Sequence, residues 1–81
     1  MFVVYAIESC STGRVYIGQS QDFDERLKLH NGGHVKSTMK ECPWRQIAQE
    51  KFDTREEARW REQQLKKSRG RRIKWLEDHK L

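Results

Sequence analysis

The stretch "RVYIGQS", residues 14–20, decides how the first part of this chain folds. Val15, Tyr16 and Ile17 are β-branched or aromatic, and Gly18 followed by two polar residues ends the apolar run. This composition is typical of a short strand that stops at a turn. A tyrosine two residues before that glycine has two interpretations. Tyr16 either packs in the core, as most strand tyrosines do, or directs its phenol toward a phosphate group.

A second strand precedes this stretch. Residues 2–8, "FVVYAIE", are mostly β-branched or aromatic, and the run is too short for a helix with a polar face. They predict a buried strand. Between the two strands, "SCSTGR" supplies turn-forming residues, so the strands are expected to pair as an antiparallel hairpin. Tyr5 and Tyr16 then lie on adjacent strands, near each other across the hairpin.

The next segment predicts a helix, a loop and a third strand. Asp22, with Glu25 three residues later, is a good N-cap for a helix that "NGG", residues 31–33, ends. Residues 32–43 have the composition of a loop. "WRQIAQEKF", residues 44–52, alternates imperfectly, but the flanking Pro43 and Asp53-Thr54 bound it as a strand.

Two further helices complete the chain. Thr54 and Glu57 form a second capping box, and the helix that they begin is expected to run to about residue 67. Ser68 is a candidate cap for a last helix. The order β-β-α-β-α-α predicts one compact α+β domain over residues 1–81, because a chain of this length builds only one core.

The composition narrows the classes of partner. The chain has 17 Lys+Arg against 12 Asp+Glu, a formal charge of +5. This excess favours a nucleic acid or another polyanion as the partner, although a soluble basic protein without such a partner has the same balance. Only 35% of the residues are hydrophobic, so the core is thin. Trp44, Trp60 and Trp75 are expected to pack there rather than to stack on bases.

The two cysteines give little support for a metal or disulfide framework. Cys10 and Cys42 are far apart, without the paired spacing that a structural zinc site needs. A disulfide stays open, but free buried thiols in a reducing cytoplasm are favoured. No apolar run approaches the length of a membrane span, and no basic region precedes the short N-terminal apolar stretch. A cytoplasmic protein without a membrane partner is expected.

Glu62 is the unusual residue of the second predicted helix. It lies between Ala58 and Leu65 on the stripe that should face the sheet, where an unpaired carboxylate is unfavourable. Either it pairs with a neighbour such as Arg59 or lies at the rim, or it is a metal ligand or an acid–base group. In the first helix, Arg26 and His30 share one face, which is either a solvated face or a phosphate-binding one.

These residues resemble a known family. "VVY" at 3–5, "YIG" at 16–18, the spacing to Arg26, "HN" at 30–31 and "EEARWREQQLKK" at 56–67 are similar to the ordered motifs of GIY-YIG endonucleases. The closing "KKSRGRRIKWL" resembles small stand-alone bacterial members. The first motif is Val-Val-Tyr rather than Gly-Ile-Tyr, but its tyrosine is kept. The likeness covers almost the whole chain and implies a three-stranded antiparallel sheet flanked by helices.

The resemblance also implies an activity, the metal-dependent hydrolysis of phosphodiester bonds in DNA. By matching position, the catalytic set is Tyr5, Tyr16, Arg26, His30 and Glu62. Glu62 is the implied ligand of one Mg²⁺ or Mn²⁺ ion, and Arg26 is expected to stabilise charge in the transition state. Tyr16, with Tyr5 as a second candidate, is expected to orient or deprotonate the attacking water. No small-molecule cofactor is expected.

Two groups of residues outside this set are candidates for contact with the nucleic-acid backbone. They are Lys36, Ser37, Thr38 and Lys40 in the loop, and Arg69, Arg71 and Arg72 at the start of the last helix. Each group has the alternative of a plain solvated surface. The function of the whole chain has an alternative too: a non-catalytic nucleic-acid-binding module with the same fold. A third possibility is an interaction domain whose charge is incidental.

Overall fold

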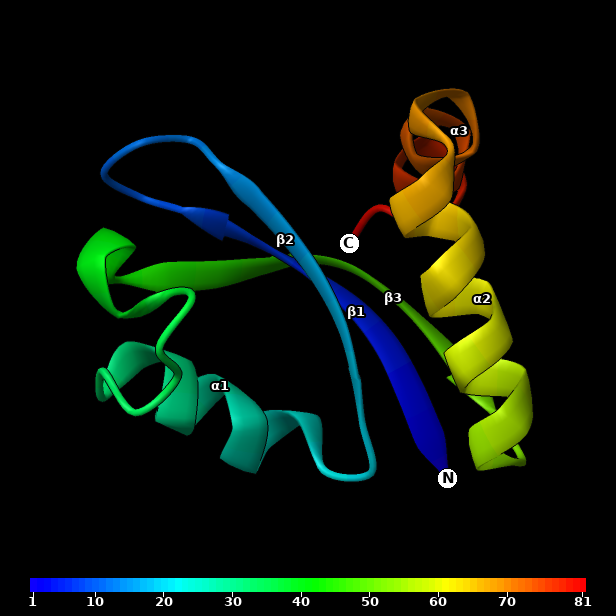
Figure 1. Cartoon of the computed structure of the whole chain (residues 1–81), viewed down its shortest axis with the longest axis horizontal. Coiled ribbons are helices and arrows are strands. Elements are labelled where there is room, and N and C mark those ends of the chain that lie inside the picture. The colour runs from blue at the N-terminus through cyan, green and yellow to red at the C-terminus, as the bar shows by residue number, and fades with distance from the viewer.

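The chain folds as a three-stranded antiparallel sheet with helices on both faces. The computed structural model describes residues 1–81. The elements are β1 (Phe2–Ser9), β2 (Val15–Ser20), α1 (Phe23–Asn31), the short 3-10 helix η1 (Met39–Glu41), β3 (Trp44–Phe52), α2 (Arg55–Lys67) and α3 (Arg69–Asp78) (Figure 1). The strand order is β2-β1-β3, so β1 is central. The predicted order β-β-α-β-α-α is confirmed, with η1 as an addition within the predicted loop.

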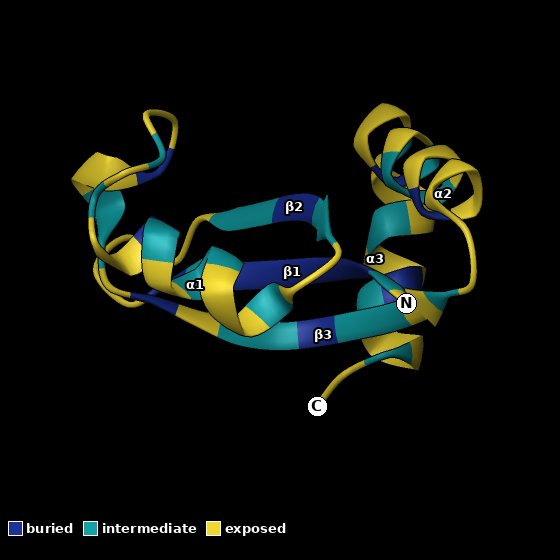
Figure 2. Cartoon of the chain, turned by 90° about the horizontal axis from the view of Figure 1, so that it is seen from below, coloured by how far each residue is buried: buried dark blue, intermediate teal, exposed yellow.

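The helices divide between the two faces of the sheet. Alternate residues of β1 point to opposite faces. Tyr5 and Ile7 belong to a cluster with Trp44 on the face that α1 covers, whereas Val4 and Ala6 belong to the core under α2 and α3. Figure 2 shows β1 as the buried strand between α1 on one side and α2 and α3 on the other. The sheet therefore separates two small cores.

A bulge in β3 explains the imperfect alternation of its sequence. Ala6 pairs with Ala48, but the next residue of β1, Ile7, pairs with Gln46. Ile47 is thus the extra residue of β3, and a bulge of this kind shifts which face each later side chain occupies. The C-terminus lies against this point, since the backbone amide of Leu81 donates to the Ile47 carbonyl at 3.1 Å.

Side-chain caps begin all three α-helices, as the sequence predicts. The caps are Asp22, Thr54 and Ser68, which accept from the backbone amides of Glu25, Glu57 and Arg71 at 3.1, 3.2 and 3.3 Å. Each cap satisfies an amide that has no partner within its own helix. After α1, Gly33 takes the left-handed conformation, with φ of 76°, and turns the chain into the loop.

Three expectations about single residues need correction or refinement. Trp44 and Trp75 are buried as expected, but the packing role is wrong for Trp60, which is 55% exposed. Both cysteines are free, yet Cys10 is exposed rather than buried, while the partly buried Cys42 thiol donates to the His30 carbonyl at 3.0 Å.

None of the helices combines the length and apolar character that crossing a membrane requires.

Candidate active site

A buried hydrogen-bond chain joins β1, α1 and the loop that follows α1. The Tyr5 hydroxyl lies 2.9 Å from Nε2 of His30, and Nδ1 of His30 lies 2.8 Å from Oγ1 of Thr38. All three residues are fully buried. The sequence therefore places Tyr5 and His30 together, 25 residues apart, through the antiparallel sheet and the packing of α1 upon it.

The contact at the far end of this chain is compatible with one set of hydrogen-bond directions, in which the tautomer of His30 decides which atoms donate. The Thr38 hydroxyl donates to the Val35 carbonyl at 3.3 Å, so its oxygen accepts from His30. Nδ1 of His30 then carries the proton and Nε2 carries the lone pair. The Tyr5 hydroxyl consequently donates to Nε2, and its own oxygen keeps its lone pairs for another donor.

The Arg26 guanidinium lies close enough to both tyrosines to interact with their phenols. Interaction with the Tyr5 phenol raises the pKa of the Arg26 guanidinium, and the Tyr16 phenol acts in the same direction. The Nε atom of Arg26 is buried without any hydrogen-bond acceptor. A buried donor without a partner is unfavourable, so the site is suited to an acceptor such as a phosphate oxygen.

Burial sets the protonation of the Tyr5–His30 pair. It raises the pKa of the Tyr5 phenol to about 12, although Arg26 acts in the opposite direction. Burial, and after it the charge of Arg26, lowers the pKa of His30 from its ordinary value of 6.5. Both groups are therefore neutral near pH 7, which agrees with the hydrogen-bond directions above.

Gly18 makes room for the two phenols and explains the "YIG" motif. A Cβ atom at position 18 would lie 2.6 Å from the Tyr5 hydroxyl oxygen and 3.0 Å from Cε1 of Tyr16. Gly18 pairs directly with Tyr5 across the β1–β2 ladder. The requirement is for space, because only a residue without a side chain leaves the Tyr5 hydroxyl where His30 can hold it.

Glu62 reaches the same region from α2. Its carboxylate accepts from Lys66 Nζ at 3.0 Å, and that ammonium lies 5.8 Å from the centre of the Tyr16 ring. After the larger effect of burial, the negative charge of Glu62 is one of the causes that raise the pKa of Tyr5. The carboxylate is therefore paired, but with Lys66 instead of Arg59, and its charge acts on the Tyr5 phenol.

The side chains at this site can bind a divalent ion only through a single protein ligand, the Glu62 carboxylate. The structure has no cluster of three or more His, Cys, Asp or Glu side chains that could hold a metal. Lys66 occupies one carboxylate oxygen of Glu62, and the side chain keeps 18% of its surface exposed. A hard cation such as Mg²⁺ commonly keeps several waters and binds through one or two carboxylates plus substrate phosphates, which is compatible with this arrangement.

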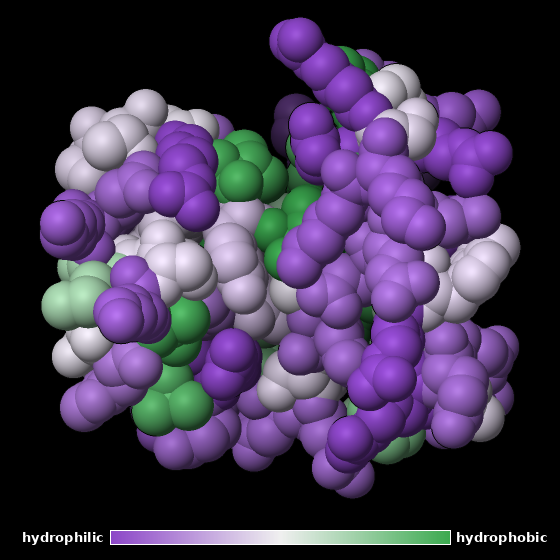
Figure 3. All heavy atoms as spheres, viewed as in Figure 1, coloured by the Kyte–Doolittle hydropathy of each residue, from purple (hydrophilic) through white to green (hydrophobic).

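The five predicted residues therefore lie in one region, with Tyr5 and His30 buried beneath an open face. The surface hollows of the protein are lined by other residues, so the expected cleft at the tyrosines is not present as a pocket. Figure 3 shows weakly polar and apolar side chains gathered over β2 between the α1 side and α2, whose surface is hydrophilic. An open face of this kind suits a polymer better than an enclosed small molecule.

The predicted backbone-contact residues differ in what the structure allows. Lys36, Ser37 and Lys40 are exposed in the loop, as are Arg69 and Arg71 at the start of α3. Thr38 is a correction: it is fully buried and holds His30, so it does not face a ligand. Arg72 is partly buried and donates to the Leu65 carbonyl at 3.3 Å, which gives it a place in the α2–α3 junction.

Sequence reasoning missed the residues that support the site. Asn31 donates to the Trp44 carbonyl at 3.1 Å and accepts from the Trp44 amide at 2.6 Å, which ties the end of α1 to the start of β3. This contact explains the asparagine of "HN", because it fixes the turn that carries His30. Lys66 had a signal in the sequence, since it follows Glu62 by four residues on one helix face.

The comparisons with known proteins identify the family of the chain. The model of the GIY-YIG catalytic domain matches residues 1–74. The chain belongs to the GIY-YIG family, which is a family of nucleases.

Small bacterial proteins are its relatives. A UPF0213 protein of Staphylococcus saprophyticus is 35% identical over 74 residues, which cover 89% of this chain and 90% of that protein. A UPF0213 protein of Streptococcus agalactiae is 33% identical over 79 residues, covering 95% and 89%. One of Staphylococcus aureus is 36% identical over 64 residues, covering 78% and 77%. No solved structure matches the chain.

Proposed function

We propose that this protein is a metal-dependent endonuclease that hydrolyses phosphodiester bonds in DNA, with residues 1–81 acting as one nuclease domain. The observation that supports the proposal best is the position of Arg26. Its guanidinium interacts with both phenols and keeps a buried, unpartnered Nε donor, while the negative charge of Glu62 on α2 acts on the Tyr5 phenol. Membership of the nuclease family supports the same chemistry.

The two tyrosines take different roles because their exposure differs. Tyr16 is half-buried and can touch a ligand, so it orients the attacking water through its hydroxyl oxygen. Tyr5 is fully buried, so its role is to position Arg26 through the lone pairs of its hydroxyl oxygen. The hydroxyl itself donates a hydrogen bond to His30. Arg26 donates to a non-bridging phosphate oxygen and stabilises the negative charge that grows there as water attacks phosphorus.

Glu62 is the residue that would hold Mg²⁺ or Mn²⁺. Such an ion, when bound, supplies charge neutralisation at the phosphate and promotes ionisation of water. With one protein ligand, its affinity depends on the substrate phosphate as well, so tight binding of the metal by the free protein is not expected. Lys66 would shift away from Glu62 or remain as a second positive charge beside the phosphate.

Cleavage of branched, nicked and duplex DNA in Mn²⁺ tests the proposal. Glu62→Ala should abolish cleavage, and Tyr16→Phe should lower its rate by about 10²-fold or more. Glu56→Ala is the matched control, because Glu56 is an exposed acid of the first turn of the same helix. Equal nicking by wild type, Glu62→Ala and Glu56→Ala would identify a contaminating nuclease.

The alternative function, a non-catalytic nucleic-acid-binding module, has one observation in its favour. The ion pair with Lys66 neutralises Glu62, and a binding surface for phosphate benefits from that neutralisation. The two functions differ in one measurement. DNA binding that weakens steeply with salt, without cleavage of any DNA structure in Mg²⁺ or Mn²⁺, would establish the binding module and refute the nuclease.

A further inference from the structure

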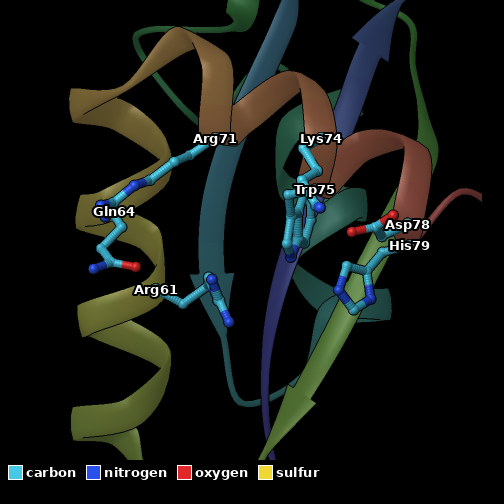
Figure 4. Close-up of a pocket in the computed structure, with 7 residues that line it drawn as sticks. All are labelled: Arg61, Gln64, Arg71, Lys74, Trp75, Asp78 and His79. Atoms are coloured by element: carbon cyan, nitrogen blue, oxygen red, sulfur yellow. The ribbon is translucent and has the colours of Figure 1, made fainter.

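A second surface with the chemistry of a nucleic-acid site lies between α2 and α3 and continues onto the outer face of α2. A hollow of about 440 Å³ between these helices is lined by Arg61, Gln64, Arg71 and Lys74, with Trp75 as its floor (Figure 4). In that view Arg71 reaches from α3 toward Gln64 of α2. A smaller hollow of about 250 Å³ shares Gln64 and Arg71 and adds Trp60 and Lys67. We call the two together the α2–α3 groove.

This groove is separate from the candidate active site. Ala58 and Leu65 are the buried residues of α2 and face the sheet. At about 100° per residue, Trp60 and Lys67 lie roughly opposite to them, on the outward face of the helix. Glu62 and its partner Lys66 lie on the side of α2 that meets Tyr16. The body of α2 therefore stands between the two places.

The charge of the groove is strongly positive. Arg61, Lys67, Arg71 and Lys74 line it, and Asp78 is its one acidic residue. Glu50 of β3 lies beneath, but its carboxylate is already engaged, since it accepts from Trp75 Nε1 at 2.9 Å and lies 3.2 Å from Arg61 Nε. Arg61 is therefore paired with Glu50, and the cations left for an anionic ligand are Lys67, Arg71 and Lys74.

Trp60 gives the groove its second chemical feature. It is 55% exposed, whereas the other two tryptophans are buried and their indole N–H groups are hydrogen-bonded. The guanidinium of Arg61 lies 5.4 Å from the centre of the Trp60 ring, a cation–π distance that steadies the indole. A fixed, exposed aromatic ring among cations is the combination that binds single strands, through stacked bases and neutralised phosphates.

We propose that the α2–α3 groove binds a single-stranded segment of nucleic acid, with one base stacked on Trp60 and phosphates on Arg71 and its neighbours. The assignment of this segment to the substrate rests on the proposed function. To occupy both the groove and the candidate active site, a ligand must pass around α2, which is about 10–12 Å across. Duplex DNA, with a persistence length of about 50 nm, does not bend so sharply, but a single strand does. The substrate class is therefore nucleic acid that carries an unpaired segment.

Binding is measured by tryptophan fluorescence of the full chain in EDTA, which removes the divalent ions needed for cleavage. Because Trp44 and Trp75 are buried, a change in fluorescence on binding reports mainly on Trp60. The probe is a single strand of fifteen thymidines, with an abasic strand of the same phosphate count beside it. The thymidine strand should quench the fluorescence, and the abasic strand should bind more weakly and quench less. Trp60→Phe should keep the affinity and lose the quenching. Trp60→Ala should weaken binding by about 5- to 100-fold, the range expected for loss of one stacked base.

A pair of charge variants locates the phosphate contacts. Arg71→Gln should weaken binding and reduce the slope of log affinity against log salt by about 0.7, the value for one phosphate contact on a single strand. Arg59→Gln is the matched control, because Arg59 is an exposed cation of α2 that lines neither hollow. It should leave the binding curve unchanged.

Several results would overturn the inference. They are unchanged fluorescence with the thymidine strand, equal affinity of Trp60→Ala and wild type, or equal losses in Arg71→Gln and Arg59→Gln. A dimer that is seen by sedimentation and abolished by Trp60→Ala would show that this face binds a second copy of the chain. That result would also overturn the inference. Failure of the proposed function is a different result, since it shows as absent cleavage with the fluorescence titration intact.

Discussion

Replacing Gly18 by alanine should break the candidate site from within. The added Cβ atom would lie 2.6 Å from the hydroxyl oxygen and 2.8 Å from Cζ of Tyr5, against an ordinary contact of 3.4–4 Å. Tyr5 has no free space to withdraw into, because its side chain is fully buried and its hydroxyl is bonded to His30 at 2.9 Å. Either β2 moves away from β1 at the Tyr5–Gly18 pair, or the Tyr5 hydroxyl loses its hydrogen bond to His30.

The expected loss of stability is the sum of two effects. Overpacking of a well-filled core costs about 1–3 kcal/mol. Loss of one buried hydrogen bond adds about 0.5–1.5 kcal/mol. At roughly 0.05–0.15 kcal/mol per residue, a chain of this size has about 4–12 kcal/mol in total. The sum, a loss of about 1.5–4.5 kcal/mol, is therefore a large part of that total, and it corresponds to a fall in Tm of about 6–36 °C.

Urea unfolding followed by circular dichroism measures this loss. Gly70→Ala is the control, because a Cβ atom at position 70 meets nothing within 4 Å and alanine is the better residue within α3. It should leave the free energy of unfolding unchanged or raise it by up to about 1 kcal/mol. If the free energy of unfolding of Gly18→Ala were within about 0.5 kcal/mol of wild type, Tyr5 would not be held in place. That result would refute the reasoning.

Three further predictions concern this buried network and the contact that ties α1 to β3. Spectrophotometric titration of the two tyrosines should show one phenol ionising near pH 12, and Tyr5→Phe should remove that transition; two ordinary phenols would contradict the buried placement. Because burial lowers the pKa of His30 below 6.5, the unfolded chain binds that proton more tightly, so stability present above pH 6.5 should be lost as the pH falls below it. His30→Gln should flatten this part of a plot of unfolding free energy against pH, and an unchanged slope would assign the loss to other groups. Asn31→Ala removes both bonds to the Trp44 backbone and should lower the free energy of unfolding by about 1–3 kcal/mol in urea, whereas an unaltered midpoint would show that α1 is held by packing alone.

Most of the fold could be predicted because its signals are local. Asp22, Thr54 and Ser68 each mark the residue before a helix, and the structure begins a helix directly after each of them. The bulge at Ile47 could not be predicted, since it depends on the register between β3 and β1 and on the chain end that packs against it. The alternation of residues 44–52 shows only that something is irregular there.

The candidate site divides in the same way. The resemblance carried by "VVY", "YIG" and the helix motifs selects side chains that the fold then brings together. Apart from the Glu62–Lys66 pair, the supporting contacts could not be predicted, because each joins segments that no sequence spacing relates. Thr38 is the clearest case: a threonine in a basic loop has the pattern of a surface residue, yet it closes over His30 from within. The exposure of Trp60 was missed because composition alone assigns aromatic residues to the core.

The hydrogen-bond chain that starts at Tyr5 ends at a main-chain oxygen, which has no proton to hand on. His30 and Thr38 are therefore anchored to the backbone of the loop after α1, and this loop sets where the Tyr5 hydroxyl lies. A change in the conformation of the loop would displace the Tyr5 hydroxyl, although Tyr5 itself belongs to the central strand.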